Sequence, residues 1–295
     1  MDFAGLKTDT DLSDTERRLD ESEVREHPVF EYVRSLFRTS LSDDWPRFKL
    51  HINDGESSKS HAYLVGKPTF CPPELLGRGT RGYVAYECET GRFVWLKDVW
   101  RASYMLTKTE GEVLRKLNAA GVPHVPTLVC DGDVRDQATI TADWRRAKSL
   151  PDGILRQHRH HRIVVEEVCM PLDKFRYGRQ LIAVVYDCLP HHQAATNSET
   201  RILHCDISGG NILIYPKIVR VPEGQIPTVV WTGVLTDWEL SRPLDSRMSR
   251  LTTKRNQGTY QFMSVSLLTR ITKPVEICDE LESFFHVLVY YAVHY

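Results

Sequence analysis

The chain has 295 residues, of which 41% are hydrophobic and 26% charged, a balance typical of a globular protein with a full-sized core. Its formal net charge of -1 gives no reason to expect nucleic acid or a membrane surface as a partner, and no run of about 18 apolar residues predicts a membrane-spanning helix. The seven cysteines are scattered without a C-x-x-C pair, which indicates a reduced intracellular protein, cytoplasmic or nuclear.

Residues 1–60 are expected to form an N-terminal extension. Residues 1–27 are polar and charge-rich, lack the pattern of a signal peptide, and are expected to be weakly ordered, with Ser13 and Glu16 at the spacing of a capping box. Residues 28–38 are predicted to form a docking helix, because apolar side chains recur there at helical spacing: Val29, Val33, Leu36 and Phe37.

Residues 61–169 are predicted to be rich in β-structure. The runs "AYLVG", "YVAYEC" and "RFVWLKDV" indicate antiparallel strands with a hairpin through "ETGR", and residues 107–120 indicate a helix ended by Gly121. "HVPTLVCDGD" and "HRIVVEEVCM" indicate two more strands, separated by a polar surface loop over residues 131–158. The tract "HRHHR" is compatible with a metal, but ligands at fixed spacing are absent from its neighbourhood in the sequence.

Residues 170–295 are predicted to be mainly helical. A helix over residues 178–192 would bury Leu181, Val184, Val185 and Cys188. The strand "NILIY", a protruding hairpin "PKIVRVPEGQIP" and the strand "TGVL" follow. A last helix over residues 281–294 would bury Leu281, Phe284, Phe285, Leu288 and Val289.

Three glycines, Gly77, Gly79 and Gly82, fit the pattern G-x-G-x-x-G. Glycines let the backbone approach phosphate oxygens closely. A dinucleotide-binding turn would be followed by a helix, but the strand-like run "YVAYEC" follows here. We therefore expect a glycine-rich hairpin laid over a nucleotide; the alternative is a plain hairpin turn.

Lys97 lies in the apolar strand "FVWLKDV", where it would either reach solvent from an edge or be held inside for a phosphate. An internal lysine needs a counter-charge. Glu110 shares the face of Val113, Leu114 and Leu117 in the following helix, whereas Glu112 points away. We therefore predict Glu110 as the partner of Lys97.

His204, Asp206 and Asn211 fit the spacing H-x-D-x-x-x-x-N, and Asp237 follows a later strand in "LTDWEL". Two acids and an Asn at strand ends suit the placement of a hydroxyl and the binding of Mg2+ on a triphosphate. Asp206 would orient the hydroxyl or accept its proton, while Asn211 and Asp237 would bind the metal. Asx turns that end strands could explain each residue alone, but not their order.

In this order the motifs resemble the protein-kinase fold, and "GRGTR", "HCDISGGNILI", "TDWELS", "GTYQFMS" and "DELESFFHVL" resemble the fungal-type protein kinase family. The resemblance covers about residues 61–295. It implies an α+β, two-lobed fold, with a β-rich N-lobe over residues 61–169 and a mainly helical C-lobe over residues 170–295. The last expected helix runs to Tyr295, so this C-lobe is expected to be truncated, with an apolar face that a partner could cover.

Several positions differ from the kinase pattern. Cys205 replaces an Arg that normally pairs with a phosphorylated activation loop, and Ser208 replaces a Lys that normally neutralises the transferring phosphate. Glu239 stands at the position of a Gly, and Ser266 stands about where an acid anchors the activation segment. Glu280, preceded by Asp279, stands where an Asp braces the catalytic loop.

The resemblance implies a serine/threonine-type protein kinase that transfers the γ-phosphate of ATP to a protein hydroxyl with Mg2+. Lys97, held by Glu110, would clamp the α- and β-phosphates under the glycine loop. The alternatives are a kinase of small molecules, which the missing Lys permits, and an inactive nucleotide-binding pseudokinase or scaffold, which the substitutions favour.

Overall fold

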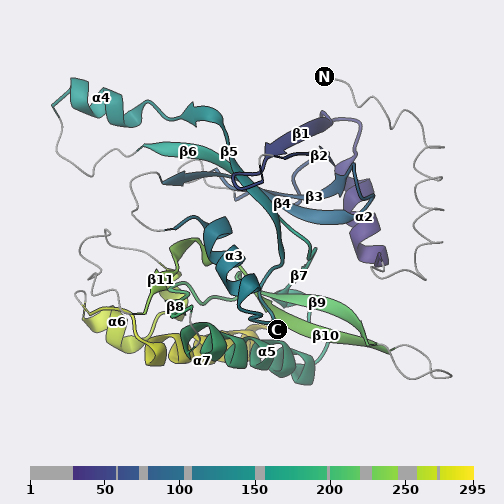
Figure 1. Cartoon of the computed structure of the whole chain (residues 1–295). Coiled ribbons are helices and arrows are strands. Elements are labelled where there is room, and N and C mark those ends of the chain that lie inside the picture. Colours follow the sequence, from purple (N-terminus) through teal and green to yellow (C-terminus); the bar gives the residue numbers. More distant parts are fainter. Residues whose placement is uncertain are drawn as a thin grey trace. The chain divides into compact units, whose positions relative to one another are not determined.

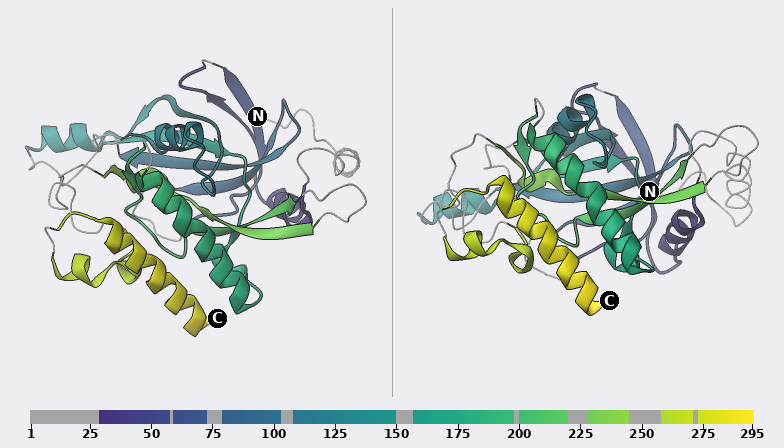
Figure 2. Two further views of the ribbon diagram at one scale, coloured as in Figure 1. Left: turned by 60° about the horizontal axis from the view of Figure 1, so that its bottom comes forward. Right: turned by 90° about the horizontal axis from the view of Figure 1, so that it is seen from below.

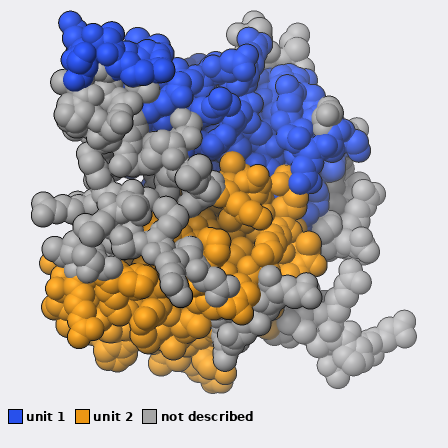
Figure 3. Space-filling view, turned by 60° about the vertical axis from the view of Figure 1, so that its left-hand side comes forward, with its two compact units in different colours: residues 1–106, 128–168 blue, residues 107–127, 169–295 orange. Residues whose placement is uncertain are grey.

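A computed structural model describes residues 29–57, 59–72, 79–102, 108–149, 157–197, 200–219, 228–244, 258–270 and 273–295. The segment expected to be weakly ordered, with its Ser13–Glu16 pair, lies outside these residues. The chain divides into two compact units, one of Met1–Leu106 and Leu128–Val168, the other of Thr107–Thr127 and Cys169–Tyr295 (Figure 3). The expected extension thus contributes helix α2 and strand β1 to the first unit.

The first unit is built on one six-stranded antiparallel sheet in the order β1-β2-β3-β4-β6-β5 (Figure 1). Its strands are β1 (Phe48–Asn53), β2 (Ser60–Val65), β3 (Arg81–Glu87), β4 (Phe93–Ala102), β5 (Leu128–Ala138) and β6 (His158–Val165). The sheet curls so that its two edge strands, β1 and β5, approach each other. The Gly55 N–H beside β1 donates to the Asp131 carbonyl of β5 at 3.1 Å. Gly132 permits this approach, since a Cβ there would lie 2.2 Å from the Asn53 carbonyl oxygen.

The two faces of this sheet have separate cores. Inside the curl the apolar side chains pack together: Ile52, Tyr63, Val65, Tyr83, Ala85, Val94, Leu96, Cys130 and Val164. The opposite face packs against α2 (Glu31–Ser40), where the ring of Phe37 lies 5.0 Å from that of Phe93. The predicted docking helix is therefore confirmed.

The predicted loop over residues 131–158 is wrong at both of its ends and in its middle. Strand β5 continues to Ala138, helix α4 (Thr141–Ala147) follows, and β6 begins at His158. Side chains that look like those of a surface loop instead pair across the sheet: the Arg101 guanidinium donates to Asp133 at 2.9 and 3.1 Å, and the His161 ring lies 2.8 Å from Asp133. Ion pairs therefore stabilise these strands where the sequence no longer alternates between apolar and polar residues.

The histidine tract is part of this ion-pair network. Burial alone would lower the pKa of the His161 imidazole, but the carboxylates of Asp131 and Asp133 outweigh it and raise that pKa. The neighbouring His160 ring lies 2.5 Å from Asp98 and stacks on Trp100. Among the described residues, neither histidine belongs to a cluster with the geometry of a metal site.

The second unit is mainly helical, so the predicted α+β class is confirmed. Its α-helices are α3 (Glu110–Ala119), α5 (Gly178–Asn197), α6 (Val265–Thr269) and α7 (Ile277–His294), with 3-10 turns η2 (Leu172–Lys174), η3 (Trp238–Leu240) and η4 (Tyr260–Phe262). Its strands are β7 (Met170–Pro171), β8 (Ile202–Leu203), β9 (Ile212–Val219), β10 (Thr228–Leu235) and β11 (Arg242–Pro243), in the sheets β10-β9-β7 and β11-β8. Helices α5 and α7 pack side by side (Figure 2).

The predicted buried face is correct for α5 and partly wrong for α7. The α5 prediction is confirmed, because all four of its apolar residues are buried: Leu181, Val184, Val185 and Cys188. The α7 prediction is wrong for three residues, because Leu281, Phe285 and Val289 are 46%, 61% and 45% exposed. Helix α7 instead buries a mixed face of Asp279, Glu280, Ser283, Phe284 and Val287. Among the described residues, none of the helices has the length and apolarity needed to span a bilayer.

Candidate active site

The loop between β8 and β9 is held by a buried histidine. His204 is fully buried, and its Nε2 lies 2.8 Å from the Thr236 carbonyl oxygen while its Nδ1 accepts the Asp206 N–H at 3.2 Å. The Trp238 ring packs edge-on against the imidazole at 4.7 Å. His204 therefore joins this loop to the segment after β10, and its role is to hold backbone rather than to face a substrate.

The carboxylate of Asp206 lies against the segment that precedes η4. Its Oδ1 accepts both the N–H and the hydroxyl of Thr259, at 2.8 and 3.0 Å. Gly258 before it has φ +97°, a conformation that favours glycine, and lies close to Asp206. These two hydrogen bonds to Oδ1 fix the orientation of the Asp206 carboxylate.

Asn211 links Asp206 to the position predicted to bind metal. Its side-chain N–H donates to the Asp206 carbonyl at 2.8 Å, so its amide oxygen is the atom available to a cation. Its own carbonyl accepts the N–H and the hydroxyl of Thr236, at 2.8 and 3.1 Å, one residue before Asp237. The structure thus brings the predicted Asp206, Asn211 and Asp237 onto two connected loops.

Asp237 lies in a group of three carboxylates that the sequence reasoning did not assemble. Oxygens of Glu110, Asp237 and Glu239 lie within 4.8 Å of one another. Glu110, on α3, is buried and its Oε1 accepts the Trp238 N–H at 3.2 Å. Clustered carboxylates repel one another unless a cation or a proton compensates, and carboxylate oxygens suit Mg2+. The donor set therefore fits that metal.

Glu110 and Glu112 have different environments on α3, since only Glu110 is buried. Glu112 is exposed and completes a capping box, accepting the Thr109 N–H at 2.6 Å while the Thr109 hydroxyl accepts the Glu112 N–H at 3.1 Å. Gly121 follows the helix with φ +66°, as predicted for its stop. Lys97 belongs to the other unit, so its pairing with Glu110 stays a prediction.

Lys97 and the described glycines lie together on the first unit. Lys97 on β4 pairs with Gly82 on β3, and Phe70 exchanges backbone hydrogen bonds with Gly82 at 2.8 and 3.1 Å. An antiparallel bridge thus joins Phe70 to Gly82 at the start of β3, and the predicted hairpin over a nucleotide stays a prediction, because its turn lies outside the described residues. Gly79 has φ +56°, and Gly82 makes room for Trp95, since a Cβ there would lie 2.2 Å from that ring. Gly77 lies outside the described residues.

Glu280 takes the bracing position that its place in the sequence indicated. Its Oε1 accepts the Cys205 N–H at 2.5 Å, which fixes the residue before Asp206 in a left-handed conformation of φ 68°.

Ser208 is buried and its carbonyl accepts the Asn211 N–H at 3.1 Å. Thr259 was missed as a site residue, although the quoted "GTYQFMS" contains it, because its distance from Asp206 in sequence hides their contact.

A comparison with known protein families identifies the family of this chain. The profile of the family described as fungal protein kinase matches residues 37–292. No curated protein matches the sequence. Among solved structures, the ROP18 kinase domain in complex with AMP-PNP and sucrose is similar at 12% identity and a TM-score of 0.47, covering 94% of this chain and 76% of that chain. The kinase domain of PF14_0431 is similar at 13% identity and a TM-score of 0.47, covering 72% of this chain and 61% of that chain. Because the profile spans most of its length, the chain belongs to the fungal protein kinase family.

Proposed function

We propose that this protein kinase is of the serine/threonine type and transfers the γ-phosphate of ATP to a hydroxyl group of a protein. In the reaction the acceptor oxygen forms a bond to the γ-phosphorus, the bond from that phosphorus to the ADP oxygen breaks, and the hydroxyl proton leaves the acceptor. Family membership supports phosphotransfer. The arrangement of Asp206 supports the choice of an alcohol as the acceptor.

The observation that carries this proposal is the pair of hydrogen bonds from Thr259 to Asp206. The Asp206 carboxylate already accepts one threonine hydroxyl at 3.0 Å. Its geometry is therefore suited to a hydroxyl donor, and a substrate Ser or Thr would be oriented by the same carboxylate. In this account Asp206 accepts the proton, and Thr259 keeps the carboxylate in place through its N–H at 2.8 Å.

The remaining predicted residues would bind the nucleotide. Gly77, Gly79 and Gly82 would bring backbone N–H groups to the phosphates, and Lys97 would bind the α- and β-phosphates. Asp237 and Asn211 would hold Mg2+, with the carboxylates of Glu110 and Glu239 adjoining Asp237. When bound, Mg2+ would supply positive charge against the phosphate oxygens. Catalysis would come mostly from positioning and electrostatics.

Ser208 favours a second candidate, an inactive nucleotide-binding scaffold. In place of a lysine ammonium the chain has a small buried side chain there. Without that charge the transferring phosphate is stabilised less well. Even the active kinase would therefore turn over at the low end of the range of about 1–100 per second. A scaffold would bind Mg-ATP without transferring phosphate.

A phosphotransfer assay tests the proposal. The purified chain would be incubated with γ-labelled ATP, Mg2+ and a library of Ser-, Thr- and Tyr-containing peptides, and the labelled residue type identified. Asp206→Asn should lower the rate by about 10²–10⁴-fold, while the exposed Asp143→Asn should leave it unchanged. Thr259→Ser, which keeps the hydroxyl, should be more active than Thr259→Val.

Three results would contradict the proposal. Label on tyrosine would remove the serine/threonine type. Label only on a small-molecule alcohol would remove the protein acceptor. Nucleotide binding without any transfer would establish the scaffold instead.

A further inference from the structure

The segment that carries Thr259 returns to the first turn of α7 through one buried serine. Ser264 is fully buried, its hydroxyl donates to Asp279 Oδ1 at 2.6 Å, and its oxygen accepts the Leu267 N–H at 3.1 Å, which caps α6. The next turn of α7 receives the Val265 N–H, which donates to Glu282 at 2.8 Å. The end of this segment is therefore fixed to α7 by side chains on two consecutive turns of the helix.

The second oxygen of Asp279 binds a lysine from beyond α6. The Lys273 ammonium lies 2.5 Å from Asp279 Oδ2 and 2.9 Å from Glu276 Oε2. Asp279 Oδ2 also accepts the Glu276 N–H at 2.9 Å. Burial alone would raise the pKa of the Asp279 carboxyl, but its hydrogen bonds to Lys273 and Ser264 outweigh burial and hold that pKa below its ordinary value. Asp279 therefore carries a negative charge and contacts Ser264, which precedes α6 in the chain, and Lys273, which follows it.

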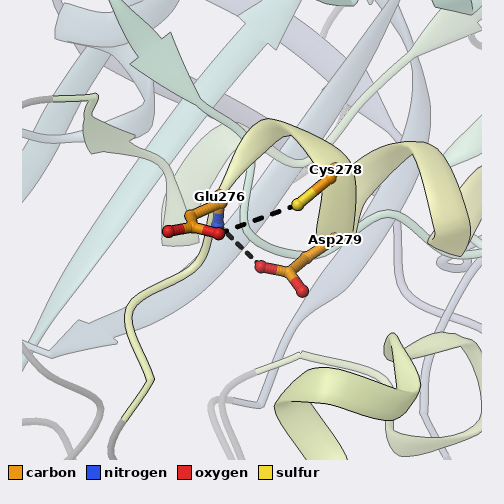
Figure 4. Close-up of side chains that lie close together, drawn as sticks. All are labelled: Glu276, Cys278 and Asp279. Atoms are coloured by element: carbon orange, nitrogen blue, oxygen red, sulfur yellow. Dashed lines mark hydrogen bonds between the residues drawn. The ribbon is translucent and has the colours of Figure 1, made fainter.

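The Asp279 cluster has the ligand types of a metal site, since Glu276, Cys278 and Asp279 lie close together (Figure 4). The Lys273 ammonium already supplies the cation there, within hydrogen-bond distance of both carboxylates. Cys278 contributes only a long contact of 3.7 Å to Glu276. The arrangement is therefore an ion-paired anchor of the chain rather than a metal site.

Adjacent acids on α7 hold the two segments that meet at Asp206. Glu280 accepts the N–H of Cys205, immediately before Asp206. Asp279 accepts the hydroxyl of Ser264, five residues after Thr259, whose N–H and hydroxyl reach the Asp206 carboxylate. Between Thr259 and Ser264, the ring of Phe262 packs edge-on against Tyr290 of α7 at 5.6 Å. The segment is therefore held at Thr259 by Asp206 and at Phe262 and Ser264 by α7.

We propose that Asp279, paired with Lys273, is a positioning residue. It holds residues 258–264 so that Thr259 meets Asp206. This inference rests on the proposed function, because Asp206 must face the acceptor for the position of Thr259 to affect the reaction. It also accounts for Ser266, which stands where an acid was expected to anchor the segment. The anchor is supplied instead by Asp279, from the helix that receives the segment.

Hydrogen exchange followed by mass spectrometry tests the placement directly, whether or not the chain is active. In Asp279→Ala, peptides covering residues 258–267 should exchange at least about tenfold faster, while β9 and β10 keep their protection. Asp279→Asn keeps an oxygen acceptor for Ser264 but loses the ion pair, so its exchange should lie between wild type and Ala. Lys273→Met should resemble Asp279→Asn, and the exposed Lys174→Met should resemble wild type.

Kinetics supply the second readout. Misplacement of residues 258–264 should raise the KM for the protein acceptor and lower kcat while leaving the KM for ATP within about twofold. Lys273→Met and Asp279→Asn should be strongly non-additive, because both break one ion pair. Unchanged exchange of residues 258–267 in both Asp279 variants would overturn the inference. Altered exchange in a chain with no phosphotransfer would support the anchor and remove the proposed function.

Discussion

Glu280→Gln should remove a pH dependence of stability that comes from one buried carboxyl. The Glu280 side chain is almost fully buried, and its Oε1 accepts the Cys205 N–H at 2.5 Å. Burial raises the pKa of the Glu280 carboxyl from 4.5 to about 8, with the backbone N–H groups opposing that increase and Asp279 adding to it. The folded protein therefore keeps Glu280 protonated at pH values where the unfolded chain has lost the proton.

The sign follows from this difference. A carboxyl with a raised folded pKa contributes its full stability below the unfolded pKa of 4.5, and that contribution is lost as pH rises toward the folded value of about 8. A difference of one pKa unit corresponds to about 1.4 kcal/mol. Between about pH 5 and about pH 8 the wild-type protein should therefore lose on the order of 3–4 kcal/mol that Glu280→Gln does not lose.

Urea unfolding over that pH range measures this difference. Glutamine keeps an oxygen for the Cys205 N–H but does not ionise, so its free energy of unfolding should rise relative to wild type as pH increases. Glu89→Gln is the control, because Glu89 is 58% exposed and lies outside the contacts of α7. Its curve should run parallel to that of wild type. Parallel curves for Glu280→Gln as well would refute the reasoning.

Three substitutions test other parts of the structure by urea unfolding. Gly233→Ala should lower the free energy of unfolding by about 3 kcal/mol or more, because its Cβ would lie 1.9 Å from a backbone carbonyl oxygen of α5. Gly178→Ala, with open space around it, should cost little, and similar costs for both would contradict the packing. Gly82→Ala should cost about 1–3 kcal/mol through its clash with Trp95, and Trp95→Phe in the same chain should recover part of that loss. Glu112→Ala should cost about 0.5–1 kcal/mol by removing the capping box, and a Gln there should restore most of it; equal losses in Ala and Gln would exclude the cap.

Local periodicity predicted the elements whose buried faces are apolar. Helix α5 was predicted correctly because its apolar residues face β10 in one continuous stripe. The face of α7 was not, because what it buries includes Asp279 and Glu280, whose hydrogen bonds compensate for burial. Strand β5 was cut short in the prediction for the same reason, since Asp133 is paired with charged side chains of other strands.

The candidate site was predictable where its residues follow a fixed spacing. His204, Asp206 and Asn211 are close in sequence, and hydrogen bonds join them within one loop. Contacts between distant segments leave no such pattern. The approach of Thr259 to Asp206 and the ion pair of Lys273 with Asp279 depend on how the chain returns to α7, and only the folded structure shows them.

The most direct test of the proposed nucleotide site is a thermal melt of the purified chain with and without Mg-ATP. A ligand at 100 times its Kd adds about 2.7 kcal/mol to the folded state, which should raise the melting midpoint by several degrees. The rise should require Mg2+, disappear in Asp237→Ala, shrink in Lys97→Met, and persist in Lys108→Met, whose lysine is exposed. A wild-type midpoint that Mg-ATP leaves unchanged would contradict the account.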